Sequence, residues 1–133
     1  AGALADYQQA IAAIEAQPPE LHVHLVSSLV GLGDALVRLG RPAEAIAPLT
    51  RALAMTVPPL YARRQPVGRY MLARALAESK RDVAGAVLEA RAARAAIAER
   101  GEDDDEAWLP VIDAFIAGHG RRPGGVAPLP PRR

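Results

Sequence analysis

Few residues of this chain combine the type and the spacing that catalysis requires. His22 and His24 are two positions apart, and on a helix that spacing turns them about 200° from each other, so they cannot share a metal ion. The segment Gly31-Leu32-Gly33 lies inside a predicted helix and lacks the third glycine and the Lys-Ser/Thr of a phosphate-binding loop. We therefore predict a protein that is not an enzyme and binds no cofactor.

The acidic run from Glu102 to Glu106 is the other feature that suggests chemistry. It lacks the ligand spacing of a calcium loop, whereas negative charge is favourable at the start of a helix. The chain has no cysteine, which excludes disulfides, thiolate zinc sites and cysteine nucleophiles. The sequence therefore predicts no metal site.

One pair of residues favours binding over chemistry. Tyr70 and Arg74 are four positions apart, so they share one face of a helix. An aromatic ring beside a guanidinium can stack on an extended peptide and pair with a carboxylate. The alternative interpretation is that Arg74 pairs with Glu78 on a solvated face.

Length and composition indicate one all-helical domain. The chain has 133 residues, half of them hydrophobic but only 4% aromatic, and it is rich in the helix-forming residues Ala, Leu, Arg and Glu. Sixteen basic and fifteen acidic side chains give a net charge of +1, which does not predict nucleic-acid binding. Because no apolar run approaches the length of a membrane span, we predict no membrane contact.

Apolar periodicity and breaker residues predict about six antiparallel helices. Pro18-Pro19, Gly40, Val57-Pro58-Pro59 and Gly101 separate them, and Asp82 is the predicted N-cap of the fifth. We place the helices at residues 3–16, 20–39, 42–55, 66–79, 83–99 and from the acidic run to about 117. The helical array spans 1–118, and a Gly/Pro/Arg-rich tail spans 119–133. Since the chain begins within a helical pattern and without Met, we expect a piece of a longer protein.

Small and large residues recur together at a period near 40. Matching sets are Ala3, Tyr7 and Ala10; Ala45, Leu49 and Ala52; and Ala86, Ala90 and Ala93. The intervening helices repeat as well, as Leu32, Leu36 and Gly40; Leu72, Leu76 and Lys80; and Ile112, Ile116 and Gly120. A two-helix period of this length is typical of a helical solenoid.

The segment from Val26 to Pro58 resembles a tetratricopeptide repeat. The residues that carry the resemblance are Leu29, Leu32, Gly33, Leu36, Ala45, Leu49, Ala52 and Pro58. The second copy, at about 68–99, departs from the pattern because Ala73 replaces the glycine and Arg69 stands where a large apolar residue is usual. The period resembles the longer variant of the family rather than its 34-residue form.

The resemblance implies a right-handed solenoid of two full repeats with a half repeat at each end. In that family the first helices of successive repeats line a concave groove that binds partners. Carried onto this chain, it implies a partner-binding set of Val30, Asp34, Val37, Tyr70 and Arg74. The family's carboxylate clamp is not expected, because the chain has no asparagine and Asp34 occupies a clamp position.

The phrase GLGDALVRLGRPAEAIAPLTRALA also resembles repeat regions at the C-termini of large bacterial, especially myxobacterial, serine/threonine kinases. That resemblance implies a cytoplasmic signalling protein as the parent, although no kinase signature lies in this chain. We expect a non-catalytic scaffold that binds a peptide or helix of a protein partner. The alternative is self-association through the terminal helices, at Leu4, Tyr7 and Ile11 or at Trp108, Ile112 and Phe115.

Overall fold

A computed structural model describes residues 2–101 and 103–121, and every element in them is helical. The main helices are α1 (Gly2–Glu15), α2 (Leu25–Arg38), α3 (Pro42–Ala54), α4 (Gln65–Glu78), α5 (Val83–Arg100) and α7 (Trp108–Arg121). Shorter elements are the 3₁₀ turns η1 (Pro19–His24) and η2 (Pro59–Tyr61) and the one-turn helix α6 (Asp103–Glu106). The prediction of an all-α fold with six helices is confirmed. The tail was predicted at 119–133, but residues 119–121 belong to α7, and the rest of it lies outside the described residues.

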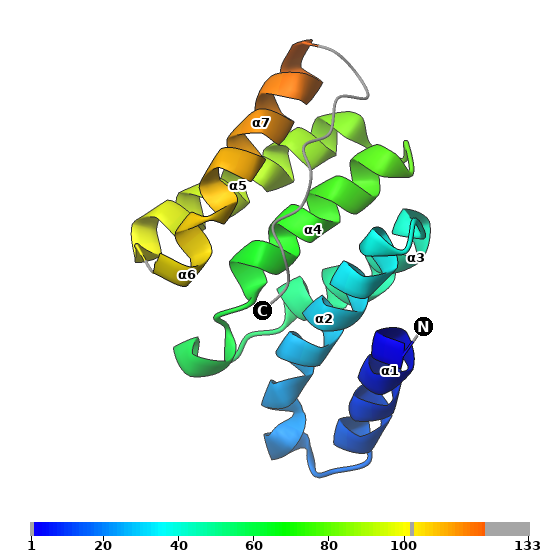
Figure 1. Ribbon diagram of the computed structural model, residues 1–133. Helices are drawn as coiled ribbons and strands as arrows, with labels where there is room; N and C mark the ends of the chain where they lie inside the picture. The colour runs from blue at the N-terminus through cyan, green and yellow to red at the C-terminus, as the bar shows by residue number, and fades with distance from the viewer. Residues whose placement is uncertain (1, 102, 122–133) are drawn as a thin grey trace.

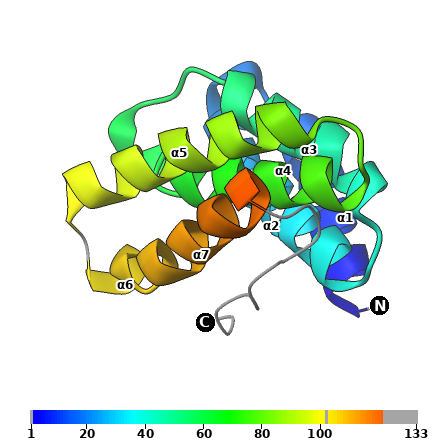
Figure 2. The same ribbon diagram turned by 90° about the horizontal axis from the view of Figure 1, so that it is seen from above.

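Consecutive main helices pack against each other along the chain, and α2 also packs directly on α4. Figure 1 shows α2, α4 and α7 side by side in one row, with α3 and α5 behind them. Figure 2, seen from above, shows the same two layers edge-on. The row of α2, α4 and α7 is called the front row below.

Three helix contacts at α2 depend on glycines. A Cβ added to Gly31 would lie 2.2 Å from a ring carbon of Tyr7 on α1, and one added to Gly33 would lie 2.3 Å from Cγ of Leu49 on α3. On α4, a Cβ added to Gly68 would lie 2.8 Å from a methyl carbon of Val30 on α2. Each glycine therefore admits a large side chain from the neighbouring helix, and α1, α3 and α4 all approach α2 closely.

The connections between helix pairs repeat as well. Pro18-Pro19 and Pro58-Pro59 stand 40 positions apart, and Pro18 and Pro58 have nearly the same backbone angles, with φ of −55° and −57°. Each pair starts a 3₁₀ turn because proline fixes φ and lacks an N–H. The His24 ring of η1 contacts the Tyr61 ring of η2 edge-on, with the ring centroids 5.2 Å apart, and this contact joins the two 3₁₀ turns.

One helix boundary was predicted from a single residue and is confirmed. The side chain of Asp82 accepts a hydrogen bond from the Gly85 N–H at 2.8 Å, as an N-cap does. Pro110 lies in the first turn of α7, where its missing N–H removes no helical hydrogen bond.

Two boundaries differ from the prediction. The predicted helix at 20–39 begins as the 3₁₀ turn η1, and the last predicted helix is divided into α6 and α7 before Trp108. A single helix from the acidic run through Pro110 would place the proline ring against the carbonyl of Glu106 and break the helix there.

One stretch of the described residues, Pro19–Arg38, is long and apolar enough to cross a membrane by length and composition alone. More than half of it is buried inside the fold. A helix that is covered on two sides by its neighbours needs such a composition without any membrane, so the packing of α2 accounts for the pattern.

The crossing at Gly33 is directly testable. Gly33→Ala should lower the free energy of unfolding by about 1–3 kcal/mol, because the fully buried Leu49 must move to admit the new methyl group. Gly2→Ala is the matched control, since a Cβ at Gly2 meets nothing within 4 Å. Urea unfolding followed by circular dichroism measures both, and equal midpoints would contradict the close approach.

Candidate functional site

The five residues predicted to bind a partner come together in the front row. Val30, Asp34 and Val37 lie on α2, and Tyr70 and Arg74 lie on the adjacent α4. Val30 and Tyr70 stand 40 positions apart, as do Asp34 and Arg74. Equivalent positions in the sequence therefore occupy equivalent places on neighbouring helices.

All five residues are buried, which differs from the expectation that they line an open groove. Val30 and Tyr70 have no exposed surface, and Asp34 and Arg74 are only 5% and 8% exposed. Val37 and Tyr70 belong to the larger apolar cluster, and Val30 belongs to a second cluster under α1 and α3. These side chains hold the front row together, and their contact with a partner stays a prediction.

The two buried charges are paired within their own helices. Asp34 accepts a hydrogen bond from Nε of Arg38 at 2.6 Å, and Arg74 donates one from Nε to Glu78. The pair on α2 runs from acid to base and the pair on α4 from base to acid, so the sign order is reversed between the helices. Arg38 and Glu78 are about one-quarter exposed, so each pair presents its outer member to solvent. The structure thus contains the ion pair between Arg74 and Glu78 that was the alternative interpretation of Arg74, although Arg74 itself is buried.

Tyr70 is at the centre of an aromatic cluster. Its ring meets Trp108 and Phe115 of α7 edge-on, with centroid distances of 5.8 and 5.5 Å. Its buried hydroxyl lies near the Arg74 guanidinium, and among the described residues it makes no hydrogen bond of regular geometry. Burial raises the pKa of Tyr70 because it opposes ionisation; the nearby Arg74 lowers the pKa by less. Tyr70 thus connects α4 to α7 rather than facing solvent.

The apolar side chains of the terminal helices α1 and α7 are also more buried than expected. Trp108, Ile112 and Phe115 were expected at an exposed end, but all three are buried in the larger cluster. On α1, Ile11 is buried and Leu4 and Tyr7 are half-buried. Sequence reasoning missed how far α7 folds onto α4, because the periodicity of α7 identifies its apolar face but not the helix that covers it.

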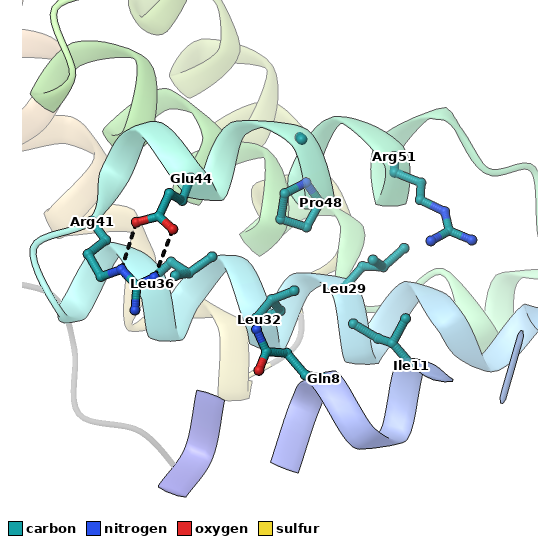
Figure 3. A pocket seen from close by; sticks show the side chains of 10 residues that line it. Gln8, Ile11, Leu29, Leu32, Leu36, Arg41, Glu44, Pro48 and Arg51 are labelled. Atoms are coloured by element: carbon teal, nitrogen blue, oxygen red, sulfur yellow. Dashed lines mark hydrogen bonds and ion pairs between the residues drawn. The ribbon is translucent and has the colours of Figure 1, made fainter. Parts of the chain in front are cut away.

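A separate hollow of about 410 Å³ opens between α1 and α3, with α2 as its floor (Figure 3). Leu29, Leu32 and Leu36 line the floor. The Arg41–Glu44 pair stands at one end, and at the other Arg51 pairs with Glu15 across the two helices at 2.9 Å. The hollow therefore combines an apolar floor with an ion pair at each end.

Within residues 2–101 and 103–121, no three His, Asp or Glu side chains come together as metal ligands. The Nε2 atom of His22 lies 2.9 Å from the carbonyl oxygen of Gln17, a local hydrogen bond at the start of η1.

No known family model, curated protein or solved structure matches the chain. Proposals about function therefore rest on the residues and contacts described above.

The buried hydroxyl of Tyr70 provides a test of this packing. Tyr70→Phe should change the stability at neutral pH by less than about 1 kcal/mol, because it removes only a buried hydroxyl that makes no hydrogen bond of regular geometry. Tyr70→Ala should cost about 3–5 kcal/mol by leaving a cavity against Trp108 and Phe115. Urea unfolding of the two variants measures the difference.

The pH dependence gives a second readout of the same variants. Since the pKa of Tyr70 is raised above 10.0 in the folded protein, the unfolded chain loses this proton at a lower pH than the folded one. The associated stability is present below pH 10 and is lost as the pH rises further. Tyr70→Phe should therefore lose less stability than the wild type above about pH 10. Identical slopes would contradict a buried, protonated phenol.

Proposed function

We propose that this chain is a non-catalytic protein-interaction module, a tetratricopeptide-like array of the longer-period variant. The observation that carries the proposal is structural equivalence at a spacing of 40 residues. Val30 and Tyr70, Asp34 and Arg74, and the two proline pairs occupy matching places in successive helix pairs. Repeats of this kind stack into right-handed solenoids whose extended surfaces bind partners.

The partner segment in this proposal is a peptide or helix that lies along the front row. Arg38 on α2 and Glu78 on α4 are the outer members of the two ion pairs and present opposite charges at the surface of the front row. A partner segment with both signs of charge is therefore favoured. The buried Val30, Val37 and Tyr70 set the spacing between the helices that bear these charges. In this proposal the partner-binding set from the sequence acts by positioning, since Asp34 and Arg74 hold the outward Arg38 and Glu78 in place.

The resemblance to the repeat regions of bacterial serine/threonine kinases supports a place in a larger cytoplasmic signalling protein. In that setting the module recruits a protein partner and carries out no chemistry itself. No nucleic acid and no membrane takes part in this proposal.

Arg74 tests the front row as the binding surface. A partner is first captured on the immobilised protein and identified by mass spectrometry. Arg74→Gln should then weaken its binding about fivefold, with a loss that shrinks as salt screens the charge. Arg41→Gln is the matched control, because it also breaks one Arg–Glu pair but lies on the opposite layer. Equal affinities of the two variants, both folded, would exclude the front row as the site.

Self-association is the second candidate, favoured by an open face at the end of the array. A hollow of about 400 Å³ between α5 and α7 is lined by Ala95, Ile116 and Ala117, together with Arg91 and the Arg94–Asp113 ion pair. Leu109 and Val111 are only half-buried on α7. In this candidate, a second copy covers the apolar part of this surface, as neighbouring repeats cover each other in a repeat array.

Light scattering over a range of concentrations distinguishes this candidate. Self-association predicts a mass that rises toward twice the monomer, and Ile116→Glu should abolish the rise by placing a charge in the interface. Leu88→Glu, at an exposed position of α5, should leave the rise unchanged. A constant monomer mass excludes the candidate.

A further inference from the structure

Helix α1 lies at one edge of the molecule and is less covered than its equivalents in the repeat. Figure 1 shows it beside α2, at the opposite end of the array from α7. Three positions of α1 match positions of α3 and α5 at offsets of 42 and 83 residues. All six matching side chains on α3 and α5 have no exposed surface, whereas the three on α1 are half-buried: Ala3, Tyr7 and Ala10.

The difference in burial follows from the neighbours of each helix. Helix α3 packs between α2 and α4, and α5 packs between α4 and α7, whereas α1 packs mainly on α2 and η1. On its other flank, the hollow of about 410 Å³ separates α1 from α3. One front-row helix therefore holds α1, where two hold each of its equivalents.

Little of α1 is buried in the fold. Ile11 is the one buried side chain among its 14 residues, and eight of the others are exposed. The ion pair from Glu15 to Arg51 on α3 has both side chains nearly half exposed, so it contributes little to stability. A helix with few buried apolar side chains opens at a lower free energy than the whole domain unfolds.

The surface that α1 covers on α2 is nevertheless specific in shape. A Cβ at Gly31 would lie 2.2 Å from a ring carbon of Tyr7, so this position admits the ring because it has no side chain. Ile11 packs in the same apolar cluster as Leu25 and Leu29. We call Leu25, Leu29 and Gly31 the α1 seat. A helix fits this seat when an aromatic ring meets Gly31 and an aliphatic side chain follows four positions later.

The helix that meets this requirement is α1 itself, so a second copy of the chain carries a fitting occupant. An exchanged α1 would make the same contacts between copies as it makes within one, including the pair of Glu15 with Arg51. Only Ala16, Gln17 and Pro18 join α1 to η1. Short connections of this kind favour the exchange of an element between copies.

We propose that α1 exchanges between two copies of this chain, so that the α1 helix of each copy occupies the α1 seat of the other. The exchange needs no partner on the front row and no contact through α7. Its failure therefore leaves the proposed function standing, and the reverse also holds.

The first experiment replaces the second copy by a fluorescein-labelled peptide with the sequence of residues 2–17. Fluorescence anisotropy with the whole chain should show saturable binding, weakened because the chain's own α1 competes for the seat. Ile11→Ala in the chain should tighten peptide binding at least about fivefold, since it loosens the competing helix and leaves the seat unchanged. Gln9→Ala, at an exposed position of the same helix, should leave the affinity unchanged.

The seat itself is tested from both sides of the contact. Gly31→Leu in the chain should abolish peptide binding, because its side chain takes the place of the Tyr7 ring. Thermal unfolding followed by circular dichroism shows whether this variant is folded. A peptide with alanine for both Tyr7 and Ile11 leaves the protein unchanged and should bind at least about tenfold more weakly.

The second experiment detects the exchanged dimer. It forms slowly, since α1 must open first, so the chain is refolded from urea at millimolar concentration and then diluted. Light scattering after size exclusion should show a species of twice the monomer mass that persists for hours. Ile116→Glu should keep this species and Gly31→Leu should lose it, whereas reversible association through α7 predicts the opposite pattern.

Hydrogen exchange on the dilute monomer measures the opening of α1 directly. The backbone amides of Ile11 and Ile14 should exchange faster than those of Leu49 on α3, which has no exposed surface. Equal exchange rates would overturn the proposal, because α1 would then open only when the whole domain unfolds. Peptide affinity that is the same for Ile11→Ala and the wild type would also overturn it, as would a refolded Ile116→Glu chain that is entirely monomeric.

Discussion

The close approach of three helices to α2 is the constraint on which the rest of the structure depends. Gly31 admits Tyr7, Gly33 admits Leu49, and Val30 fills the space above Gly68. Each contact fixes the distance between two helix axes, because backbone rather than side chain sets the limit of approach. Once α1, α3 and α4 are fixed around α2, the places of the charged and aromatic side chains on those helices follow.

The buried ion pairs fit this arrangement because each is closed within one helix. Asp34 pairs with Arg38 and Arg74 pairs with Glu78, so each buried charge has an opposite charge four positions along its own helix. Removing water from an unpaired charge would cost several kcal/mol, roughly the scale of a domain's whole stability. Local pairing therefore lets the front row pack tightly and still carry charge at its rim. The aromatic contacts of Tyr70 then extend the packing to α7.

The helices could be predicted from the sequence because their signals are local. The proline pairs and Asp82 act within one turn of themselves, and the structure has the helix boundaries where those rules place them. The burial of Tyr70 could not be predicted the same way. It depends on Trp108 and Phe115, which are about 40 residues away in the chain. Likewise, the hollow lined by Arg63, Arg69 and Arg100 brings together arginines from three segments that no sequence spacing relates.

The paired prolines have a consequence for how such a protein can diversify. Because Pro18-Pro19 and Pro58-Pro59 end one helix pair and start the next, the residues between them and the following helix contribute little to the core. Leu21 and Leu60 in these turns are exposed, so substitutions there leave the helix contacts intact. Connections that tolerate change on a rigid frame are where recognition usually evolves. In a longer chain built from this unit, each junction can acquire its own specificity while the helical frame stays the same.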